Sequence, residues 1–391
     1  MITVEEAKEL VMNAFKPQGF ERISLSKALN RVLFADIFSP ISMPPFRQSA
    51  MDGYALRLDD VSQKLKLQGV VKAGDTEVPT LLVGHALRIF TGAMVPDTAD
   101  IVVMQEKVEV ENDKIVIKDS NLKSQMNVRS VGEQIKMGSI AVKKRTVLSP
   151  GVIGFIASLG ITEVEVVKKP NIALAITGDE LIQPGNSLLL GQVYESNSIT
   201  IQSAAESTGY NISETVFLKD NFEETKSKIN RLISNFDALI ITGGISVGDY
   251  DFVWKSLQEL GCEVLFYKVK QKPGKPLLIG KVGNCSVFAL PGNPYAALSC
   301  YYQYVLTALD LLSGKANAGL GVLKLPLSHD YTKKGDRAEF LKAKVVDGKV
   351  TVLSAQASSM LSAFTDANAQ VYIPWDVNEL REGERVKCYL F

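Results

Sequence analysis

The chain has 391 residues, with 43 basic and 43 acidic side chains, so its formal net charge is zero. This balance excludes the broad basic surface of a nucleic-acid-binding protein, and the apolar fraction of 46% predicts several folded cores rather than a disordered chain. No apolar run reaches the roughly 18 residues of a membrane span, and two histidines are too few for a histidine-rich metal centre.

The N-terminal segment is predicted to be mostly helical. Thr3 and Glu6 have the spacing of a capping box, and the apolar residues behind them recur on one helical face. A second helix is expected over residues 26–35, and a third begins at Pro150 and stops at Gly160. The acidic, amphipathic start is unlike a signal peptide, and four cysteines without a CxxC pair are typical of a reducing cytoplasm.

Residues 40–135 have the pattern of a small β-rich domain. Short runs of alternating polar and apolar residues are broken by Gly, Pro and Asn-Asp. Strands are expected at residues 66–72, 101–105 and 107–118, the last with a hairpin turn at residues 111–113.

From residue 171 to about 313, strands and helices alternate. The expected strands are residues 171–176, 212–218, 237–241, 263–269 and 286–290, and the expected helices are residues 197–209, 221–235, 251–261 and 294–312. This alternation predicts an α/β domain whose mostly parallel sheet carries helices on both faces, with ligands beyond the carboxyl ends of the strands. Short strands at residues 338–346 and 349–355 then predict a small C-terminal β domain.

The sequence TGGISVGDYD, residues 242–251, joins an expected strand to an expected helix. Gly243 and Gly244 permit close backbone approach, and free amides at the following helix start favour an anion. The loop lacks the Lys-Ser/Thr pair of a Walker A loop, and its glycine spacing is not that of a dinucleotide fingerprint. Asp249 and Asp251 beside a phosphate would suit Mg²⁺, a hard cation. The alternative is a tight turn in which Asp251 only caps the helix.

Four further clusters of polar residues stand in loops. They are KPGKP at residues 272–276, LPGNP at residues 290–294, ITGDE at residues 176–180 and PPFRQSAMDGY at residues 44–54. Each one alone also fits an ordinary loop, such as a solvated basic turn or a helix cap. Four of the five clusters belong to the α/β domain, and three of these lie at or near strand ends, which predicts a single anion-binding cleft.

These strings, in this order, resemble the MoeA family of molybdopterin molybdenumtransferases, which are related to the gephyrin E domain. The likeness covers essentially the whole chain. It includes SAMDGYA at residues 49–55, RIFTGA at residues 88–93, VVMQE at residues 102–106 and TGDEL at residues 177–181.

The resemblance implies four domains. They are a mostly helical, elongated dimerisation domain formed by residues 1–38 and 136–168, an inserted β-rich domain of residues 39–135, an α/β molybdopterin-binding domain of residues 169–316 and a C-terminal β domain of residues 317–391. It also implies a cytoplasmic homodimer, with a cleft formed by the α/β domain of one subunit and the inserted domain of the other.

The implied reaction takes adenylylated molybdopterin and molybdate, releases AMP with the help of Mg²⁺ and leaves molybdenum on the dithiolene. The upstream adenylyltransferase is a possible partner. Three alternatives stay open: a paralogue with low activity or a preference for tungstate, a pterin-nucleotide-binding module without turnover, and a scaffold protein.

The resemblance also assigns the site. Catalytic or positioning roles are expected for Asp52, Thr91, Glu180, Asp220, Asp249 and Asp251, of which Asp249 and Asp251 are the expected Mg²⁺ ligands. The substrate and its phosphates are expected at Thr177, Gly178, Asp179, Gly243, Gly244, Ser246, Gly248, Pro291, Gly292 and Asn293. Molybdate is expected at Lys272, Lys275, Pro276, Lys342 and Ser358.

The chain departs from the family pattern at four positions. Arg47 and Gln134 stand where aspartates are usual, Ala296 replaces a serine after the PGNP turn, and Lys342 aligns with an arginine. Lysine keeps the charge but loses the bidentate fork of arginine, and a lost hydrogen bond to an anion costs about 1.5–3 kcal/mol. The phosphate side of the site is therefore predicted to be intact and the oxyanion side weakened.

Overall fold

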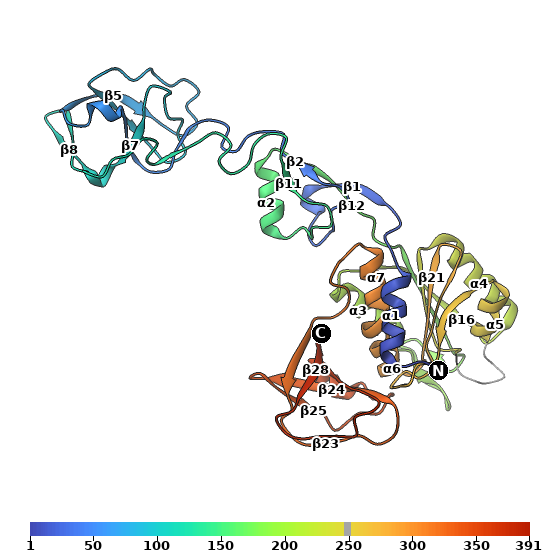
Figure 1. Ribbon diagram of the computed structural model, residues 1–391. Coiled ribbons are helices and arrows are strands. Elements are labelled where there is room, and N and C mark those ends of the chain that lie inside the picture. The colour runs from blue at the N-terminus through green and yellow to red at the C-terminus, as the bar shows by residue number, and fades with distance from the viewer. Residues whose placement is uncertain (246–251) are drawn as a thin grey trace. The chain divides into compact units, whose positions relative to one another are not determined.

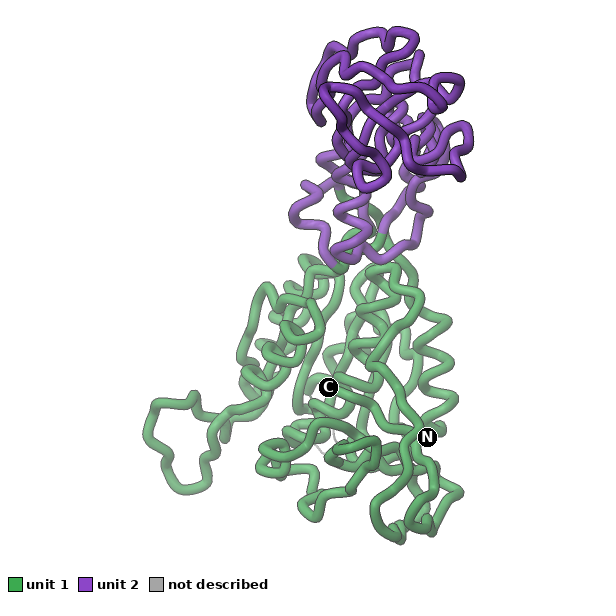
Figure 2. Tube along the Cα trace, turned by 90° about the vertical axis from the view of Figure 1, so that its left-hand side faces the viewer, with its two compact units in different colours: residues 1–21, 30–32, 167–391 green, residues 22–29, 33–166 purple. Residues whose placement is uncertain are grey.

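The computed structural model describes residues 1–245 and 252–391 (Figure 1). Its internal contacts divide the chain into two compact units, coloured separately in Figure 2. The larger unit comprises residues 1–21, 30–32 and 167–391, and the smaller unit comprises residues 22–29 and 33–166. Within the described ranges, no helix combines the length and the apolar character needed to cross a bilayer.

The larger unit contains the predicted α/β sheet, with strand order β16-β13-β17-β21-β20-β18. The first four strands run parallel, and β20 and β18 continue the sheet in antiparallel pairs. The strands are β13 (Ile172–Thr177), β16 (Ile212–Leu218), β17 (Ala238–Thr242), β18 (Glu263–Tyr267), β20 (Leu278–Val282) and β21 (Cys285–Leu290). The predicted α/β fold with a mostly parallel sheet is confirmed; β20 is the strand of this sheet that the sequence prediction lacks.

Helices cover both faces of this sheet, as Figure 1 shows. They are α1 (Val4–Ala14), α3 (Asn197–Ser207), α4 (Phe222–Asn235), α5 (Phe252–Glu259), α6 (Pro294–Cys300) and α7 (Leu306–Leu312). Because side chains alternate along a strand, Ile240 of β17 packs with α1, α3, α6 and α7, whereas Leu239 and Ile241 pack with α4 and α5. A π-helical turn, η4 (Tyr301–Val305), joins α6 to α7 within the predicted long helix.

The capping box predicted for the first helix is present. The Glu6 amide donates to Thr3 Oγ1 over 3.2 Å, and the Thr3 amide donates to Glu6 Oε2 over 2.8 Å. The apolar face behind the cap buries Val4, Ala7 and Val11. These side chains join the core between α7 and the α/β sheet, so α1 belongs physically to the larger unit.

A second sheet in the larger unit has the order β19-β24-β26-β28-β22, with β25 paired to β24. Its strands are β19 (Gln271–Lys272), β22 (Val322–Pro326), β24 (Ala338–Val346), β25 (Lys349–Val352), β26 (Ala369–Ile373) and β28 (Arg385–Leu390). The short elements beside the two sheets are β14 (Leu181–Ile182), β15 (Val193–Tyr194), β23 (Tyr331–Thr332), β27 (Glu379–Leu380) and η5 (Ser362–Thr365). Strand β19 lies in sequence between β18 and β20 of the α/β sheet, but it pairs in parallel with β24. The α/β segment therefore contributes an edge strand to the second sheet.

The smaller unit is built on a six-stranded sheet of order β7-β4-β6-β5-β9-β8. These strands are β4 (Gly53–Leu56), β5 (Leu65–Val71), β6 (His85–Ile89), β7 (Ile101–Met104), β8 (Val108–Glu111) and β9 (Lys114–Ile117). The other elements of this unit are β2 (Ile37–Phe38), β3 (Gln48–Ser49), β10 (Val128–Arg129), β11 (Ile140–Val142), α2 (Pro150–Ser158), η1 (Leu25–Lys27), η2 (Leu58–Asp60) and η3 (Gln105–Lys107). Strands β1 (Phe20–Ser24) and β12 (Glu163–Val167) lie where the chain passes from one unit to the other. The predicted hairpin is present, and its turn residues Asn112 and Asp113 have positive φ angles of 46° and 61°.

The helix predicted at residues 26–35 is wrong. The segment holds one short 3₁₀ turn, η1, and Asn30 then adopts a left-handed φ of 60°, which ends any helix. Beyond it the chain is extended. The Arg31 guanidinium donates to Glu21 Oε1 over 2.6 Å and to the Val167 carbonyl over 2.8 Å, and Leu33 forms an antiparallel bridge with Val166. Tertiary partners therefore override the helical pattern.

A half-buried lysine connects α1 to the second sheet. Lys8 Nζ donates to Gln303 Oε1 and to the Tyr389 hydroxyl, each over 2.7 Å, and lies 4.2 Å from the centre of the Tyr389 ring. Burial, reinforced by the charge of Lys387, lowers the pKa of Lys8 to about 7. Near neutral pH the folded protein therefore holds this amine partly in its neutral form, and the two groups that accept its hydrogen bonds are uncharged.

This lysine predicts a pH dependence of stability. An unfolded lysine has a pKa of about 10.4, so between about pH 7 and pH 10 the unfolded chain binds a proton that the folded protein does not. The free energy of unfolding should then rise with pH, by up to about 1.4 kcal/mol per unit. Denaturant unfolding at pH 7, 8 and 9 should show that Lys8→Met lacks this rise. Lys16→Met removes an exposed lysine just beyond the same helix and is the control; equal slopes in both variants would contradict the prediction.

Candidate functional site

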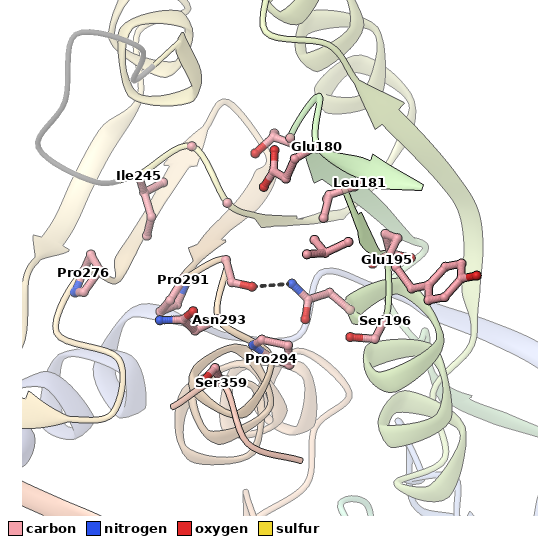
Figure 3. Close-up of a pocket in the computed structure, with 18 of the residues that line it drawn as sticks. Glu180, Leu181, Glu195, Ser196, Ile245, Pro276, Pro291, Asn293, Pro294 and Ser359 are labelled. Carbon is pink, nitrogen blue, oxygen red and sulfur yellow. Dashed lines mark hydrogen bonds between the residues drawn. The ribbon is translucent and has the colours of Figure 1, made fainter. Parts of the chain in front are cut away.

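The predicted motifs of the α/β domain meet at one edge of the sheet. Strands β13, β17 and β21 are parallel and in register, so Ile176 pairs with Thr242, and Thr242 pairs with Leu290. The turns that follow these strands therefore emerge side by side and surround a pocket of about 820 Å³. The predicted residues that line it are Thr177, Gly178, Glu180, Asp220, Gly243, Gly244, Pro276, Pro291, Gly292 and Asn293. In Figure 3, Glu180 and Leu181 lie across this pocket from Asn293 and Pro294.

The turn after β17 requires glycine for two reasons. Gly243 and Gly244 have left-handed φ angles of 87° and 63°. A Cβ on Gly243 would stand 2.4 Å from Thr177 Oγ1, and a Cβ on Gly244 would stand 2.6 Å from Val253 Cγ2. The Gly243 amide donates to the Leu290 carbonyl over 3.0 Å, and the Thr177 hydroxyl donates to the Thr242 carbonyl over 3.2 Å. This turn is thus packed closely between its two neighbours, with its backbone at the pocket surface.

Four predicted residues of the same loop, Ser246, Gly248, Asp249 and Asp251, lie outside the described residues. Both expected Mg²⁺ ligands are among them. In residues 1–245 and 252–391, no three His, Cys, Asp or Glu side chains are grouped so that they could hold a metal ion.

Carboxylates gather at the side of the pocket that follows β13 and β16. The Asp220 amide donates to Asp179 Oδ1 over 3.1 Å, and the Glu180 carboxylate lies within 3 Å of the position of a Cβ on Gly178. Desolvation, together with the negative charges of Asp179 and Glu180, raises the pKa of Asp220. Burial and mutual repulsion thus both disfavour the ionised form of Asp220.

Asn293 occupies the N-cap position of α6, as predicted, but its side chain makes no capping hydrogen bond. Instead, Asn293 Nδ2 donates to Ser358 Oγ over 3.1 Å, and the Tyr295 amide donates to the Ser358 carbonyl over 3.0 Å. The predicted residue Ser358 is therefore beside the pocket, and its neighbour Ser359 lines it. The Asn293 side chain therefore contacts a loop of the second sheet instead of capping α6.

The predicted molybdate residues are not all placed alike. Lys272 and Lys275 are exposed, and Lys272 Nζ lies 3.4 Å from Glu339 Oε1. Lys342, in contrast, is completely buried: its Nζ donates to the carbonyls of Met360 over 2.8 Å and Ala357 over 3.3 Å. Burial lowers the pKa of Lys342. The ammonium group of Lys342 is thus enclosed by the protein, unlike those of Lys272 and Lys275.

Glu195 and Asn197 are among the pocket residues that are absent from the sequence prediction. Glu195 is 1% exposed, and its carboxylate accepts from the amide of Ser198 over 2.8 Å and from the Ser198 hydroxyl. Asn197 Nδ2 donates to the Gly292 carbonyl over 2.8 Å, which is the hydrogen bond drawn in Figure 3. The signal was the string Glu-Ser-Asn-Ser at residues 195–198, in which an acid precedes the first turn of α3 and can accept from one of its free amides.

In the smaller unit, the predicted residues Asp52 and Thr91 form a pair. The Asp52 carboxylate accepts from the Thr91 amide and from the Thr91 hydroxyl, each over 2.7 Å. These two donors, with a smaller effect of the Arg88 charge, lower the pKa of Asp52. Arg47, which departs from the family pattern, donates to carbonyls of residues 96 and 99 and so holds a loop of its own domain.

This fold and this pocket define the class of the protein: a multidomain α/β protein whose ligand pocket lies beyond the carboxyl ends of parallel strands. Family descriptions match three parts of the chain. They are "MoeA N-terminal region (domain I and II)" at residues 2–160, "Probable molybdopterin binding domain" at residues 173–310 and "MoeA C-terminal region (domain IV)" at residues 324–391.

Known proteins match along their whole length. A Haemophilus influenzae protein named molybdopterin molybdenumtransferase is 33% identical over 395 residues, which cover 99% of this chain and 98% of that protein. A Staphylococcus aureus protein of the same name is 31% identical over 400 residues, covering 100% and 95%. The crystal structure of the molybdopterin biosynthesis MoeA protein from Pyrococcus horikoshii superimposes with a TM-score of 0.85 at 29% identity, over all of both chains. The chain belongs to the MoeA family of molybdopterin molybdenumtransferases, which serve molybdenum cofactor biosynthesis.

The packing of the glycine turn makes a specific prediction. Gly243→Ala should lower the free energy of unfolding by about 2 kcal/mol or more, because it combines a left-handed backbone with a contact too short for a Cβ. Gly321→Ala is the matched control in the same unit, since no atom lies within 4 Å of its Cβ position. Chemical denaturation of both variants measures the difference, and equal stability would refute this account of the turn.

Proposed function

We propose that the protein inserts molybdenum from molybdate into adenylylated molybdopterin and releases AMP in an Mg²⁺-dependent reaction. The observation that carries the proposal is the pocket: glycine-lined turns, carboxylates and a lysine-bearing loop converge beyond β13, β17 and β21. Membership of the MoeA family supports the choice of substrates.

The residues suit the cleavage of a phosphate anhydride, which needs charge neutralisation and positioning rather than a covalent nucleophile. Gly243 and Gly244 allow phosphate oxygens to approach the backbone closely, since no side chain intervenes. Lys272 and Lys275 offer exposed ammonium groups to a tetrahedral dianion. Glu180 and Asp220 orient the nucleotide from the opposite side of the pocket.

Mg²⁺ is part of the proposal on chemical grounds. Asp179 and Asp220 provide carboxylate oxygens, which are the ligands that this ion prefers, and the sequence supplies two more at Asp249 and Asp251. When bound, the ion would neutralise negative charge on the phosphates.

The remaining expectations from the sequence are also proposals. They comprise the four domain boundaries, the cytoplasmic location and a homodimer in which Asp52 and Thr91 serve the pocket of the partner subunit. The Asp52–Thr91 pair supports a working role for this carboxylate, because its two donors favour the ionised form while the side chain stays exposed.

The reaction can be tested directly. Purified full-length protein is incubated with adenylylated molybdopterin and Mg²⁺, with molybdate, tungstate or no oxyanion, and AMP is measured by chromatography. We expect AMP release that depends on molybdate and stops when EDTA removes the metal. Release with tungstate alone would favour the paralogue with altered metal preference, and no oxyanion-dependent release would favour a pterin-nucleotide-binding module.

Asp52→Ala should keep the fold and abolish cofactor maturation. The exposed side chain contributes little burial, so the melting temperature should change by no more than a few degrees, while rescue of a strain deficient in this enzyme is lost. Asp59→Ala, an exposed aspartate in the same unit, is the control and should rescue normally. Growth of the Asp52→Ala strain at the wild-type rate would show that Asp52 is not needed for cofactor maturation.

A further inference from the structure

One wall of the pocket comes from the loop that follows β25, residues 353–361, which we call the pocket-wall loop. Ser359 and Leu361 of this loop line the pocket. Ser358 ties the loop to the start of α6, through its carbonyl to the Tyr295 amide and through its hydroxyl to Asn293. The position of this loop therefore sets the shape of the pocket opposite Glu180.

Lys342 of β24 holds the other side of the same loop. Its side chain is 0% exposed, and Nζ donates to the carbonyls of Met360 over 2.8 Å and Ala357 over 3.3 Å. The main chain of Lys342 is bonded to the loop as well: its amide donates to Gln356 Oε1 over 2.9 Å, and its carbonyl accepts from Gln356 Nε2 over 2.8 Å. The Leu353 amide also donates to the Lys342 carbonyl over 3.0 Å, so five hydrogen bonds join this one residue to the pocket-wall loop.

The ammonium group has little left to offer an anion. It has three donors, of which carbonyls accept two, and the Tyr295 ring centre lies 4.2 Å from Nζ. The ammonium group is enclosed by protein atoms. To contact molybdate directly, it would have to leave these partners and move to the protein surface. Lys272 and Lys275 are already exposed and need no such change.

We propose that Lys342 is a positioning residue, which anchors the pocket-wall loop against the start of α6 and does not itself bind the oxyanion. The proposal rests on the proposed function, because it concerns how one wall of that anion site is held. It assigns to this lysine a different task from the anion contact that its alignment with an arginine implies.

Amine labelling of the wild-type, full-length protein tests the first half of the proposal. The native protein is treated briefly with an acetylating reagent, with and without molybdate, and each lysine is quantified by mass spectrometry. Lys342 should react roughly a hundredfold more slowly than Lys275 under both conditions, since reaction requires local opening. Rapid labelling of Lys342 that molybdate suppresses would overturn the proposal. If molybdate protects neither Lys275 nor Lys272 while Lys342 stays unreactive, the proposed anion site fails and the burial of Lys342 stands.

Lys342→Met tests the anchoring itself, because it keeps an apolar side chain of similar length and removes the donors. Amide hydrogen exchange in residues 357–361 should become roughly tenfold faster or more, as expected for lost charge-assisted hydrogen bonds. Lys344→Met, on the exposed part of the same strand, is the matched control and should leave this segment unchanged. Unchanged exchange in Lys342→Met would overturn the proposal.

Steady-state kinetics separate positioning from direct binding. A displaced wall should raise KM for both adenylylated molybdopterin and molybdate, whereas loss of a direct ligand would raise KM for molybdate alone and so contradict the proposal. If Lys342→Met does not fold, Gln356→Ala provides the second variant, because it frees the same loop and leaves the lysine in place. Exchange in residues 357–361 that is unaffected by Gln356→Ala would equally count against an anchored loop.

Discussion

The pocket depends on the parallel register of β13, β17 and β21. Parallel strands that end level with one another bring three turns, distant in sequence, to a single edge of the sheet. The contacts between the turns then leave no room for a side chain at Gly243, whose backbone passes close to Thr177. The Gly243 amide donates to the carbonyl of Leu290, the last residue of β21. A shift of one residue in any of these strands would separate the glycine turn of the pocket from its acids.

Much of this arrangement follows from local sequence. Capping residues, glycines and alternating apolar runs identified the parallel strands, the hairpin at residues 111–113 and the helix start at Thr3, because each is determined by its own neighbours. The helix expected at residues 26–35 failed for the opposite reason: partners on distant strands hold Arg31 and Leu33 extended. Strand β20 was not identified, since five apolar-rich residues between two turns have no distinctive period.

In the pocket, too, some features follow from local sequence and others depend on distant parts of the chain. Residues of the motifs at strand ends line one pocket, but the environment of a charged side chain could not be inferred from its neighbours in sequence. Lys342 and Lys275 are both lysines of predicted anion-binding stretches, yet one is enclosed by carbonyls and a tyrosine ring and the other is exposed. Glu195 is a related case, because the spacing of Glu195 and Ser198 in the sequence does not reveal that the fold buries this carboxylate. Burial is a property of the assembled fold.

Strand β19 has a consequence for how such proteins can evolve. Gln271 and Lys272, where the lysine-bearing loop begins, form an edge of the C-terminal sheet and pair with Ala338 and Glu339. The C-terminal domain is therefore not a separable module that recombination could exchange at a simple boundary. A replacement domain would have to supply a first strand of the same register and an acid opposite Lys272, so the two segments are constrained to diverge together.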